Sequence, residues 1–369
     1  MYAKHGMQGT KWKGVAAMRS SFKLRLPALA AVATAILILT MMPAPVAMGS
    51  TSGTAIEGPG TTQALPALTP IEQLGKAIFF DANLSKDGNQ SCATCHDPAA
   101  GYAGGSNSAA SQINAHGAVY PGSDANLFGN RKPPSAAYAG ASGLLTETAD
   151  GWVGGMFWDG RADGGDLGDP LAEQAKGPFL NPLEMALTSP EELRSRVAAS
   201  SYAGLFRQVW GANSLDVANA NTAYDQTGRS IAAYERSTEV NPYTSKFDKF
   251  WDTAKSKNKN VTAINVGNWT QYRKLGLTDT ELYGLAVFND PNQADCASCH
   301  ILGSSMAVRP LFTDYSYDNI GVPKNPENPF YTNLAYNPQG AAWEDIGLGK
   351  TVNAQSENGK MKVPTLRNV

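Results

Sequence analysis

The sequence of 369 residues predicts a mainly α-helical fold with long loops, on three observations. Helix-initiating patterns occur at residues 69–72, 189–192 and 278–281, whereas the alternating polar and apolar runs that favour strands are scarce. Glycine and proline together make up about 16% of the residues against a usual ~12%, which favours long irregular segments. One short pattern also occurs twice, which predicts two related modules.

Each predicted helix begins with residues suited to its first turn. Thr69 is followed by a proline at the first helical position and then by Glu72, an acid near the positive end of the helix dipole. Ser189 begins the second helix in the same way. Ahead of the third, Thr278 and Glu281 have the spacing of a capping box, in which each side chain bonds the backbone N–H of the other residue.

The repeated pattern is a helical stretch that precedes a cysteine motif. Residues 75–81 read Gly-Lys-Ala-Ile-Phe-Phe-Asp, and residues 284–290 read Gly-Leu-Ala-Val-Phe-Asn-Asp. A Cys-x-x-Cys-His segment follows each copy. We therefore predict an N-terminal domain at 68–238 and a C-terminal domain at 239–369, with the junction near residues 237–245.

The N-terminal part of the chain has the pattern of an export signal. Residues 26–48 are apolar and uncharged, basic residues precede them, and small residues follow at 44–50. This pattern predicts a signal peptide at 1–49, including any upstream extension, and hence a periplasmic protein. The alternative is an uncleaved membrane anchor, because ~20 apolar residues can span a bilayer. Residues 50–67 are rich in Gly, Ser, Thr and Pro, which predicts a flexible lead-in.

Composition and charge exclude several classes of protein. With 42% hydrophobic and 17% charged residues, the chain is neither disordered nor fibrous. The formal net charge is −2, but residues 1–56 hold six bases and no acid, so the remainder carries a formal charge of −8. An acidic body argues against a nucleic-acid partner and favours a basic partner protein or a small neutral ligand.

The four cysteines lie in two copies of one motif. The copies are Cys92-Ala-Thr-Cys95-His96 and Cys296-Ala-Ser-Cys299-His300. Two disulfides are one alternative in an exported chain. A zinc ribbon needs its cysteine pairs about 15–20 residues apart, whereas roughly 200 residues separate these pairs. A redox Cys-x-x-Cys does not need an adjacent histidine.

The histidine that ends each motif favours haem over these alternatives. The chain has only 4 histidines, so two motifs that both end in histidine are not expected by chance. Thiols one helical turn apart can form thioethers with the two vinyl groups of a haem, and the adjacent imidazole can bind the iron. We therefore predict two cytochrome c-like haem domains, each holding one covalently bound c-type haem.

His116 is a candidate second axial ligand. His5 precedes the predicted signal, so His116 is the only histidine left for this role, and it lies 20 residues beyond His96. The alternative is an ordinary surface histidine in the loop that contains residues 115–117.

From Leu74 to Val369 the chain resembles the bacterial diheme cytochrome c peroxidases, a family that includes diheme enzymes that oxidise protein tryptophans. The resemblance covers nearly the whole predicted exported part, in family order. Besides the two cysteine motifs, the matching segments are Gly129–Ser135, Phe157–Arg161, Glu173–Pro178, Asn181–Met185, Leu311–Asp314, Asn319–Pro323 and Val363–Val369.

The resemblance implies a different role for each haem. The N-terminal haem, on His96, would be the low-potential site where peroxide reacts. The C-terminal haem, on His300, would be the high-potential site that collects electrons. In the family, a histidine in a Gly-His-Gly-like loop caps the first iron until the other haem is reduced. The segment around His116 is a poor copy of that loop, so the alternative is a site that is always open.

The resemblance also implies the residues around the first haem. Glu184 matches the family's catalytic acid–base. Splitting peroxide requires a proton to move from one oxygen to the other, and a nearby carboxylate can make both transfers. Gln174 and Pro178 would line the distal pocket. Trp158 matches a tryptophan that lies between the haems and helps electrons to cross.

Two departures from the family concern calcium and the C-terminal haem. Relatives carry an Arg-Asn pair whose asparagine helps to bind an interdomain calcium, whereas this chain has Arg131-Lys132. Calcium is therefore a doubtful cofactor. The chain also stops at Val369, where relatives continue into the segment that holds the distal Met or Tyr of the C-terminal haem. We therefore expect the sequence to be a fragment.

The predicted function is that of a periplasmic diheme cytochrome c peroxidase. It would reduce hydrogen peroxide to water with electrons from a small cytochrome c or a copper protein, and homodimers are common in the family. One alternative is a diheme oxidase that modifies a tryptophan of a partner protein. The other is a non-catalytic electron carrier, which would not need Glu184 with Gln174 and Pro178.

Overall fold

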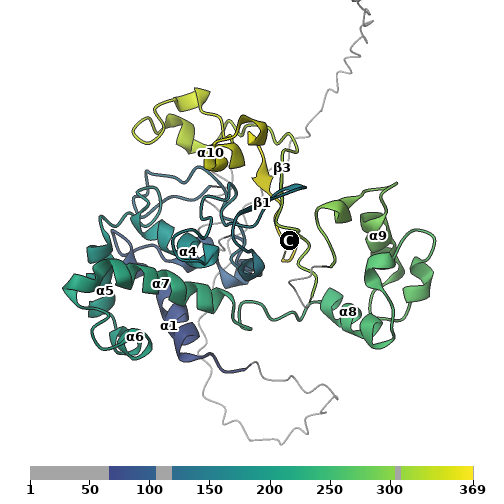
Figure 1. Ribbon diagram of the computed structural model, residues 1–369, viewed down its shortest axis with the longest axis horizontal. Coiled ribbons are helices and arrows are strands. Elements are labelled where there is room, and N and C mark those ends of the chain that lie inside the picture. The colour runs from purple at the N-terminus through teal and green to yellow at the C-terminus, as the bar shows by residue number, and fades with distance from the viewer. Residues whose placement is uncertain (1–65, 105–118, 304–308, 369) are drawn as a thin grey trace, which may run out of the picture. The chain divides into compact units, whose positions relative to one another are not determined.

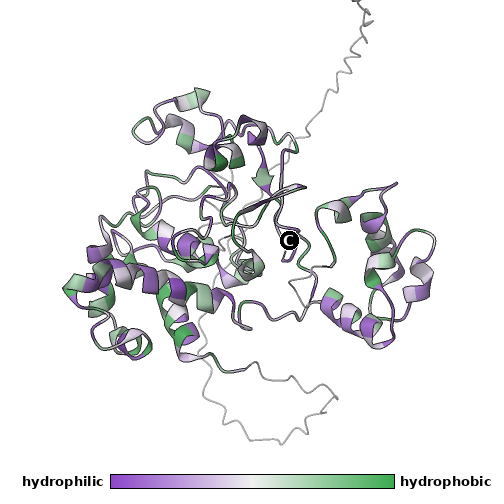
Figure 2. Ribbon diagram, viewed as in Figure 1, coloured by the Kyte–Doolittle hydropathy of each residue, from purple (hydrophilic) through white to green (hydrophobic). Residues whose placement is uncertain are grey.

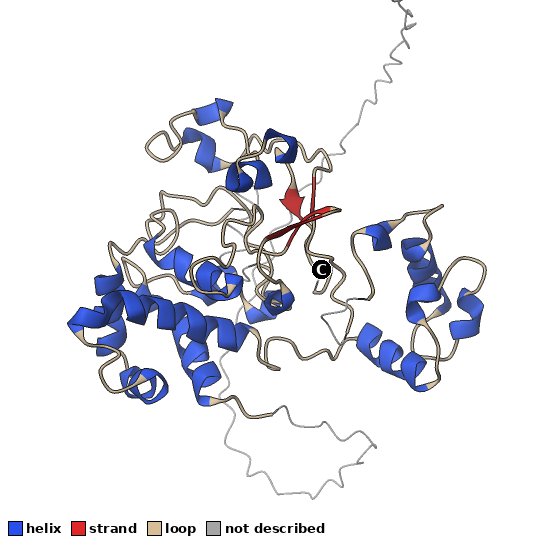
Figure 3. Cartoon of the chain, viewed as in Figure 1, coloured by secondary structure: helices blue, strands red, loops and turns tan. Residues whose placement is uncertain are grey.

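The computed structural model describes residues 66–104, 119–303 and 309–368. The predicted signal peptide at 1–49 and almost all of the lead-in at 50–67 lie outside these residues. Within the described ranges, the chain is helix-rich with few strands, as the sequence predicts (Figure 3). No described helix is long and apolar enough to span a membrane.

The helices are short and separated by loops (Figure 1). The α-helices are α1 (Pro70–Phe79), α2 (Cys92–Cys95), α4 (Pro170–Leu180), α5 (Pro190–Ala199), α6 (Ala203–Trp210), α7 (Ala220–Glu235), α8 (Lys246–Ser256), α9 (Asp279–Asn289) and α10 (Leu348–Val352). The 3-10 helices are η1 (Ala82–Leu84), η2 (Pro98–Ala100), η3 (Ala139–Ala141), η4 (Val217–Asn219), η5 (Val261–Ala263), η6 (Trp269–Tyr272), η7 (Cys296–Ser298), η8 (Pro329–Thr332), η9 (Gly340–Ala342) and η10 (Gln355–Glu357).

The three helix starts predicted from sequence are confirmed. The backbone N–H of Thr69 donates to Glu72 Oε2 at 2.7 Å in the capping box of α1, and Thr278 donates to Glu281 Oε2 at the same distance in that of α9. At α5, the hydroxyl of Ser189 accepts from the Glu192 N–H at 3.2 Å. These bonds satisfy backbone groups that have no partner inside the helix.

The larger hydrophobic core forms where α1 packs against α7. Each helix carries apolar residues beside polar ones along its length (Figure 2), and the apolar residues Leu74, Ile78 and Ile231 are fully or almost fully buried. Gly75 permits the close approach of the two helices, because a Cβ added there would lie 1.9 Å from the carbonyl oxygen of Ser230. Cys92 and Ala93 of the first cysteine motif pack against this core.

A second core lies among α8, η5, η6 and α9. Phe250 and Ala254 of α8 pack with Leu282 and Ala286 of α9, and all four are fully buried. A smaller cluster contains Met156 and residues of α4 and α7. The first core also contains Leu311 and Tyr315. The domain boundaries at 68–238 and 239–369 remain a prediction.

Two short antiparallel sheets complete the described structure. In one, β1 (Thr146–Thr148) pairs with β2 (Gly151–Val153). In the other, β3 (Tyr317–Asp318) pairs with β4 (Met361–Lys362), so that Tyr317 lies opposite Lys362. An isolated bridge joins Val153 to Ser316, and the Lys362 N–H donates to the Trp158 carbonyl at 2.8 Å. The C-terminal strand is therefore fixed against the segment around Trp158.

Candidate active site

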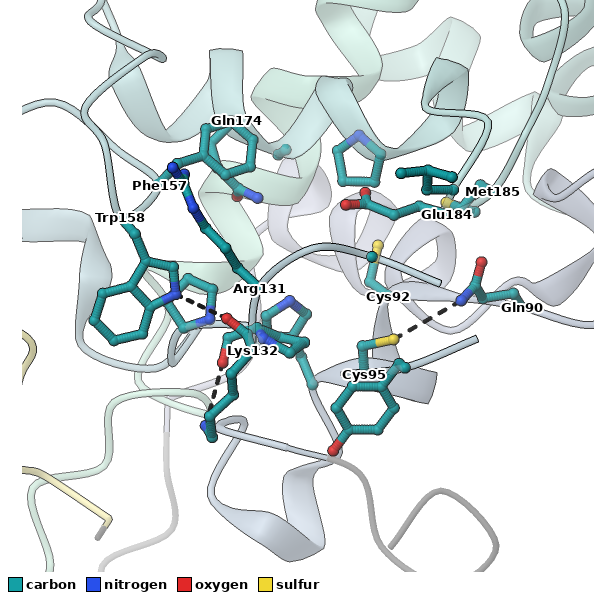
Figure 4. Close-up of a pocket in the computed structure, with 18 of the residues that line it drawn as sticks. Gln90, Cys92, Cys95, Arg131, Lys132, Phe157, Trp158, Gln174, Glu184 and Met185 are labelled. Carbon is teal, nitrogen blue, oxygen red and sulfur yellow. Dashed lines mark hydrogen bonds between the residues drawn. The ribbon is translucent and has the colours of Figure 1, made fainter. Parts of the chain in front are cut away.

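The first cysteine motif lies on one turn of helix. The cap of α2 is Ser91, and the residues Cys92 and Cys95 lie one helical turn apart, which puts both side chains on one side of the helix. With His96, they line a pocket with an empty volume of about 950 Å³ (Figure 4).

His96 is held in the form that can bind a metal. Its Nδ1 lies 3.2 Å from the Tyr102 carbonyl oxygen, and a tautomer that donates from Nδ1 to this oxygen carries its lone pair on Nε2. Burial lowers the pKa of His96 to about 4, although the hydrogen bond to Tyr102 opposes this effect. The imidazole is therefore neutral at neutral pH, as a metal ligand must be.

The second motif repeats this arrangement. The segment begins with η7, and the His300 N–H donates to the Cys296 carbonyl at 2.9 Å, as the His96 N–H does to Cys92. His300 Nδ1 lies 2.9 Å from the Phe312 carbonyl oxygen. A larger pocket of about 1,920 Å³ is lined by Cys296, Cys299 and His300.

The thiols are free in both motifs, so the disulfide alternative is wrong. Burial raises the pKa of Cys92, which keeps its thiol protonated, and raises that of Cys95 to about 12. Two unpaired thiols one turn apart, beside a neutral imidazole that lines the same pocket, fit a covalently attached haem. Each pocket thus contains the same set of residues, two cysteines and one histidine.

Residues of α4 and of the loop after it form another wall of the first pocket. Gln174 and Pro178 are four residues apart on α4, so both lie on the same face of the helix. Pro178 has no N–H, so it cannot donate to the Gln174 carbonyl as a helical residue normally would. Glu184 follows in a turn in which the Leu183 N–H donates to Asn181 Oδ1 at 3.0 Å.

Glu184 lies in the same pocket as the first cysteine motif. Figure 4 shows its carboxylate between Cys92 and the residues of α4. Burial raises the pKa of Glu184, while the positive charge of Arg161 and a hydrogen bond with Asn181 oppose the rise. A carboxyl with a raised pKa holds a proton to higher pH than an ordinary one, which suits a group that both takes and gives a proton.

Trp158 lines the pockets of both motifs. Its indole N–H donates to the Lys132 carbonyl at 2.7 Å, which fixes the ring (Figure 4). The preceding residue, Phe157, has a left-handed backbone with φ of 64°, and Arg161 stacks over its ring at 3.6 Å. Trp158 and Asn130 are therefore shared by the walls of the two pockets.

A group of charges around the buried Asp159, next to Trp158, is not predicted by the sequence. Asp159 is 5% exposed, and its carboxylate pairs with Arg131 at 2.7 Å and with Arg161 at 2.9 Å. Arg131 also makes two hydrogen bonds of 2.6 Å to Asp345. No local signal reveals the second pair, because 214 positions separate Arg131 from Asp345.

Glu235 is a second carboxyl on the wall of the first pocket that sequence reasoning missed. It is the last residue of α7, it is 4% exposed, and its Oε2 has no hydrogen-bond partner in the described part of the chain. Burial raises the pKa of Glu235 to about 8, so this carboxyl is mainly neutral at pH 7. An unpartnered buried oxygen at this wall indicates that the pocket is built for a further group.

The axial role of His116 and the calcium site stay predictions. His116 lies at 105–118, outside the described residues. At the position where relatives hold an asparagine for calcium, the Lys132 ammonium donates to the Ala103 carbonyl at 2.6 Å. No group of three or more His, Cys, Asp or Glu side chains suited to a metal ion occurs within the described ranges.

Two pockets, each lined by the free thiols of a Cys-x-x-Cys pair and by the histidine that follows, have the residues that hold the haems of a diheme c-type cytochrome. The family model described as "Di-haem cytochrome c peroxidase" matches residues 70–256. The chain belongs to this family, which implies two c-type haems.

The relatives include both branches that the sequence predicts. The chain is 32% identical over 312 residues to "Methylamine utilization protein MauG" of Paracoccus denitrificans, covering 83% of this chain and 70% of that protein. It is 29% identical to "Cytochrome c551 peroxidase" of Nitrosomonas europaea, covering 83% and 69%. The diheme peroxidase BthA from Burkholderia thailandensis has a similar structure, with a TM-score of 0.65, 28% identity and coverage of 83% of this chain and 67% of that one.

Proposed function

We propose that the protein is a periplasmic diheme peroxidase that reduces hydrogen peroxide to water. The observation that carries the proposal is the position of Glu184 in one pocket with Cys92, Cys95 and His96. An electron carrier needs no proton-transfer group beside its haem, whereas peroxide reduction does.

In this proposal, Cys92 and Cys95 attach the first haem and His96 binds its iron from one side. When bound, the haem supplies the iron that takes up peroxide and the electrons that reduce it. Glu184 accepts a proton from one peroxide oxygen and returns it to the other, which leaves as water. Two electrons and two further protons complete the reaction to two water molecules. Gln174 and Pro178 shape the space in which peroxide and the carboxyl meet.

Electrons would enter at the haem attached to Cys296 and Cys299 and bound by His300, and would cross to the first haem past Trp158. The indole supports this route because it lines both pockets. The donor would be a small cytochrome c or a copper protein with a basic surface, since the chain beyond residue 56 carries a formal charge of −8.

The test is peroxide-dependent oxidation of a reduced small cytochrome c by the haem-loaded protein from the full-length gene. We expect Glu184→Gln to lower turnover by about 100-fold or more, because positioned acid–base catalysis contributes ~10²–10⁴-fold. The matched control is Glu191→Gln, an exposed carboxyl in the first turn of α5, which should leave turnover unchanged. Unchanged turnover in Glu184→Gln would remove this role.

The second candidate function is oxidation of a tryptophan in a partner protein. The 32% identity to MauG favours this candidate. The same experiment separates the two. A protein that holds two haems, turns over no cytochrome c and keeps a long-lived oxidised spectrum after peroxide addition belongs to the protein-oxidising branch.

A further inference from the structure

Lys362 is a half-buried cation on the wall of the second pocket. It belongs to β4, its backbone N–H donates to the Trp158 carbonyl at 2.8 Å, and it lines the same pocket as Cys296, Cys299 and His300. It does not line the pocket of the first motif. The lysine thus lies beside one proposed haem site and next to the indole that both sites share.

The ammonium of Lys362 is held by neutral groups. It donates to the Ser142 hydroxyl at 3.1 Å and to the Gly155 carbonyl, and it lies 5.9 Å and 5.8 Å from the ring centres of Tyr315 and Tyr317. Carbonyl dipoles and aromatic ring faces stabilise a cation without cancelling its charge.

The acid whose field reaches Lys362 is already paired with other cations. The charge of Asp159 opposes the fall in the pKa of this lysine that burial causes, and the Asp159 carboxylate is bound by Arg131 and Arg161. Both arginines line the first pocket, not the second. The second pocket is also lined by Lys324 and by four acids, Asp295, Asp318, Glu344 and Asp345, so Lys362 supplies positive charge to a wall that holds more acids than bases.

We propose that Lys362 is a positioning charge that raises the reduction potential of the haem on His300. Accepting an electron lowers the charge of a haem by one unit, so a nearby cation favours the reduced form. A unit charge acting across roughly 10 Å in a protein shifts such an equilibrium by about tenfold. The first haem would feel less of this charge, because Lys362 does not line the first pocket. The effect would make the second haem the better acceptor for the donor's electrons.

The test is a potentiometric titration of the haem-loaded full chain, with the two haems distinguished by electron paramagnetic resonance. It is done at pH 6, because burial lowers the pKa of Lys362 to about 7 and the charge must be present. In Lys362→Met we expect the second haem to bind its electron about tenfold more weakly, which is 59 mV for a one-electron couple, while the first haem stays unchanged.

Three variants serve as controls for charge, shape and location. Lys362→Arg should restore the potential because it keeps the charge. Lys362→Gln should behave like Lys362→Met and replaces it if the apolar variant does not fold. Lys350→Met removes an exposed lysine of α10 and should change neither potential. Equal shifts of both haems, or an unchanged second haem in a folded neutral variant, would overturn the proposal.

This inference rests on the proposed attachment of a haem at His300, but not on peroxide chemistry. A protein that binds two haems yet reduces no peroxide still has two potentials to measure. A protein that holds no haem at Cys296 and Cys299 would instead refute the proposed function itself.

Discussion

The carboxyl of Glu235 and the ammonium of Lys362 are both buried, and burial moves their pKa values in opposite directions. Burial raises the pKa of Glu235 to about 8 and lowers that of Lys362 to about 7. In each case the neutral form is favoured because the charged form has lost its water. Both groups therefore change charge near neutral pH, one on the wall of each proposed haem pocket.

The raised pKa of Glu235 makes a prediction about stability. Between its unfolded pKa of about 4.5 and its folded pKa of about 8, the folded state holds a proton that the unfolded state has released. Its contribution to stability is therefore fully present below about pH 4.5 and is lost as pH rises through 8. We expect Glu235→Gln, relative to the wild type, to gain stability from pH 5 to pH 8.5.

Chemical denaturation of the haem-loaded protein at both pH values measures this difference. Glu191→Gln is the matched control, because Glu191 is exposed and should show the same offset from the wild type at both pH values. A Glu235→Gln offset that does not change with pH would mean that this carboxyl is ionised in the folded protein throughout the range.

The site residues divide into those with a local signal and those without one. The cysteine motifs are visible in sequence because the thiols and the imidazole that serve one haem must be adjacent in the chain. Glu235 has no such signal, since a glutamate at the end of a helix is ordinarily exposed. Lys362 has no local signal either, because it is covered by pairing with Tyr317 of β3, which lies 45 residues earlier in the chain.

At the scale of elements, the repeated glycine gives a matched pair of positions. Gly75 of α1 lies where a Cβ would be 1.9 Å from the Ser230 carbonyl oxygen of α7. At Gly284 of α9, no atom of the described residues outside its own helix and its chain neighbours lies within 4 Å of such a Cβ. The same residue in the same sequence pattern therefore has a packing role in one helix that it lacks in the other.

We expect Gly75→Ala to destabilise the protein by about 1–3 kcal/mol or more, because backbone must move to make room for the methyl group. Gly284→Ala should be neutral or should stabilise by up to about 1 kcal/mol, since alanine favours helix more than glycine does. Equilibrium unfolding of both variants makes the comparison. A large destabilisation in Gly284→Ala would show that α9 packs closely against another part of the protein.

The helices that the sequence predicts best are those with an N-terminal capping residue. Each of the helices α1, α5 and α9 begins at a side chain whose hydrogen bond to the next turn is local. The strands β1 to β4 are only two or three residues long. So short a strand has no measurable alternation of polar and apolar residues, and its pairing depends on a partner elsewhere in the chain.

At the scale of the whole molecule, charge makes a prediction about the electron donor. The chain beyond residue 56 carries a formal charge of −8, so a basic donor protein is attracted over long range. Raising the ionic strength from about 10 mM to 150 mM shortens the screening length from ~30 Å to ~8 Å. The second-order rate with a basic cytochrome c should fall, as measured by stopped-flow absorbance.

An uncharged hydroquinone is the control donor, because its encounter with the protein does not depend on salt. Its rate should stay constant over the same range. A basic donor whose rate is also constant would show that the net charge does not guide docking.

The indole of Trp158 has a consequence for how the two pockets can change. Its ring lines both pockets, and the backbone N–H of Lys362, in the last described strand, donates to the carbonyl of the same residue. A substitution that tilts this ring would therefore be recorded in the spectra of both haems at once. The two centres can differ in chemistry, but they cannot be reshaped independently of each other at that wall.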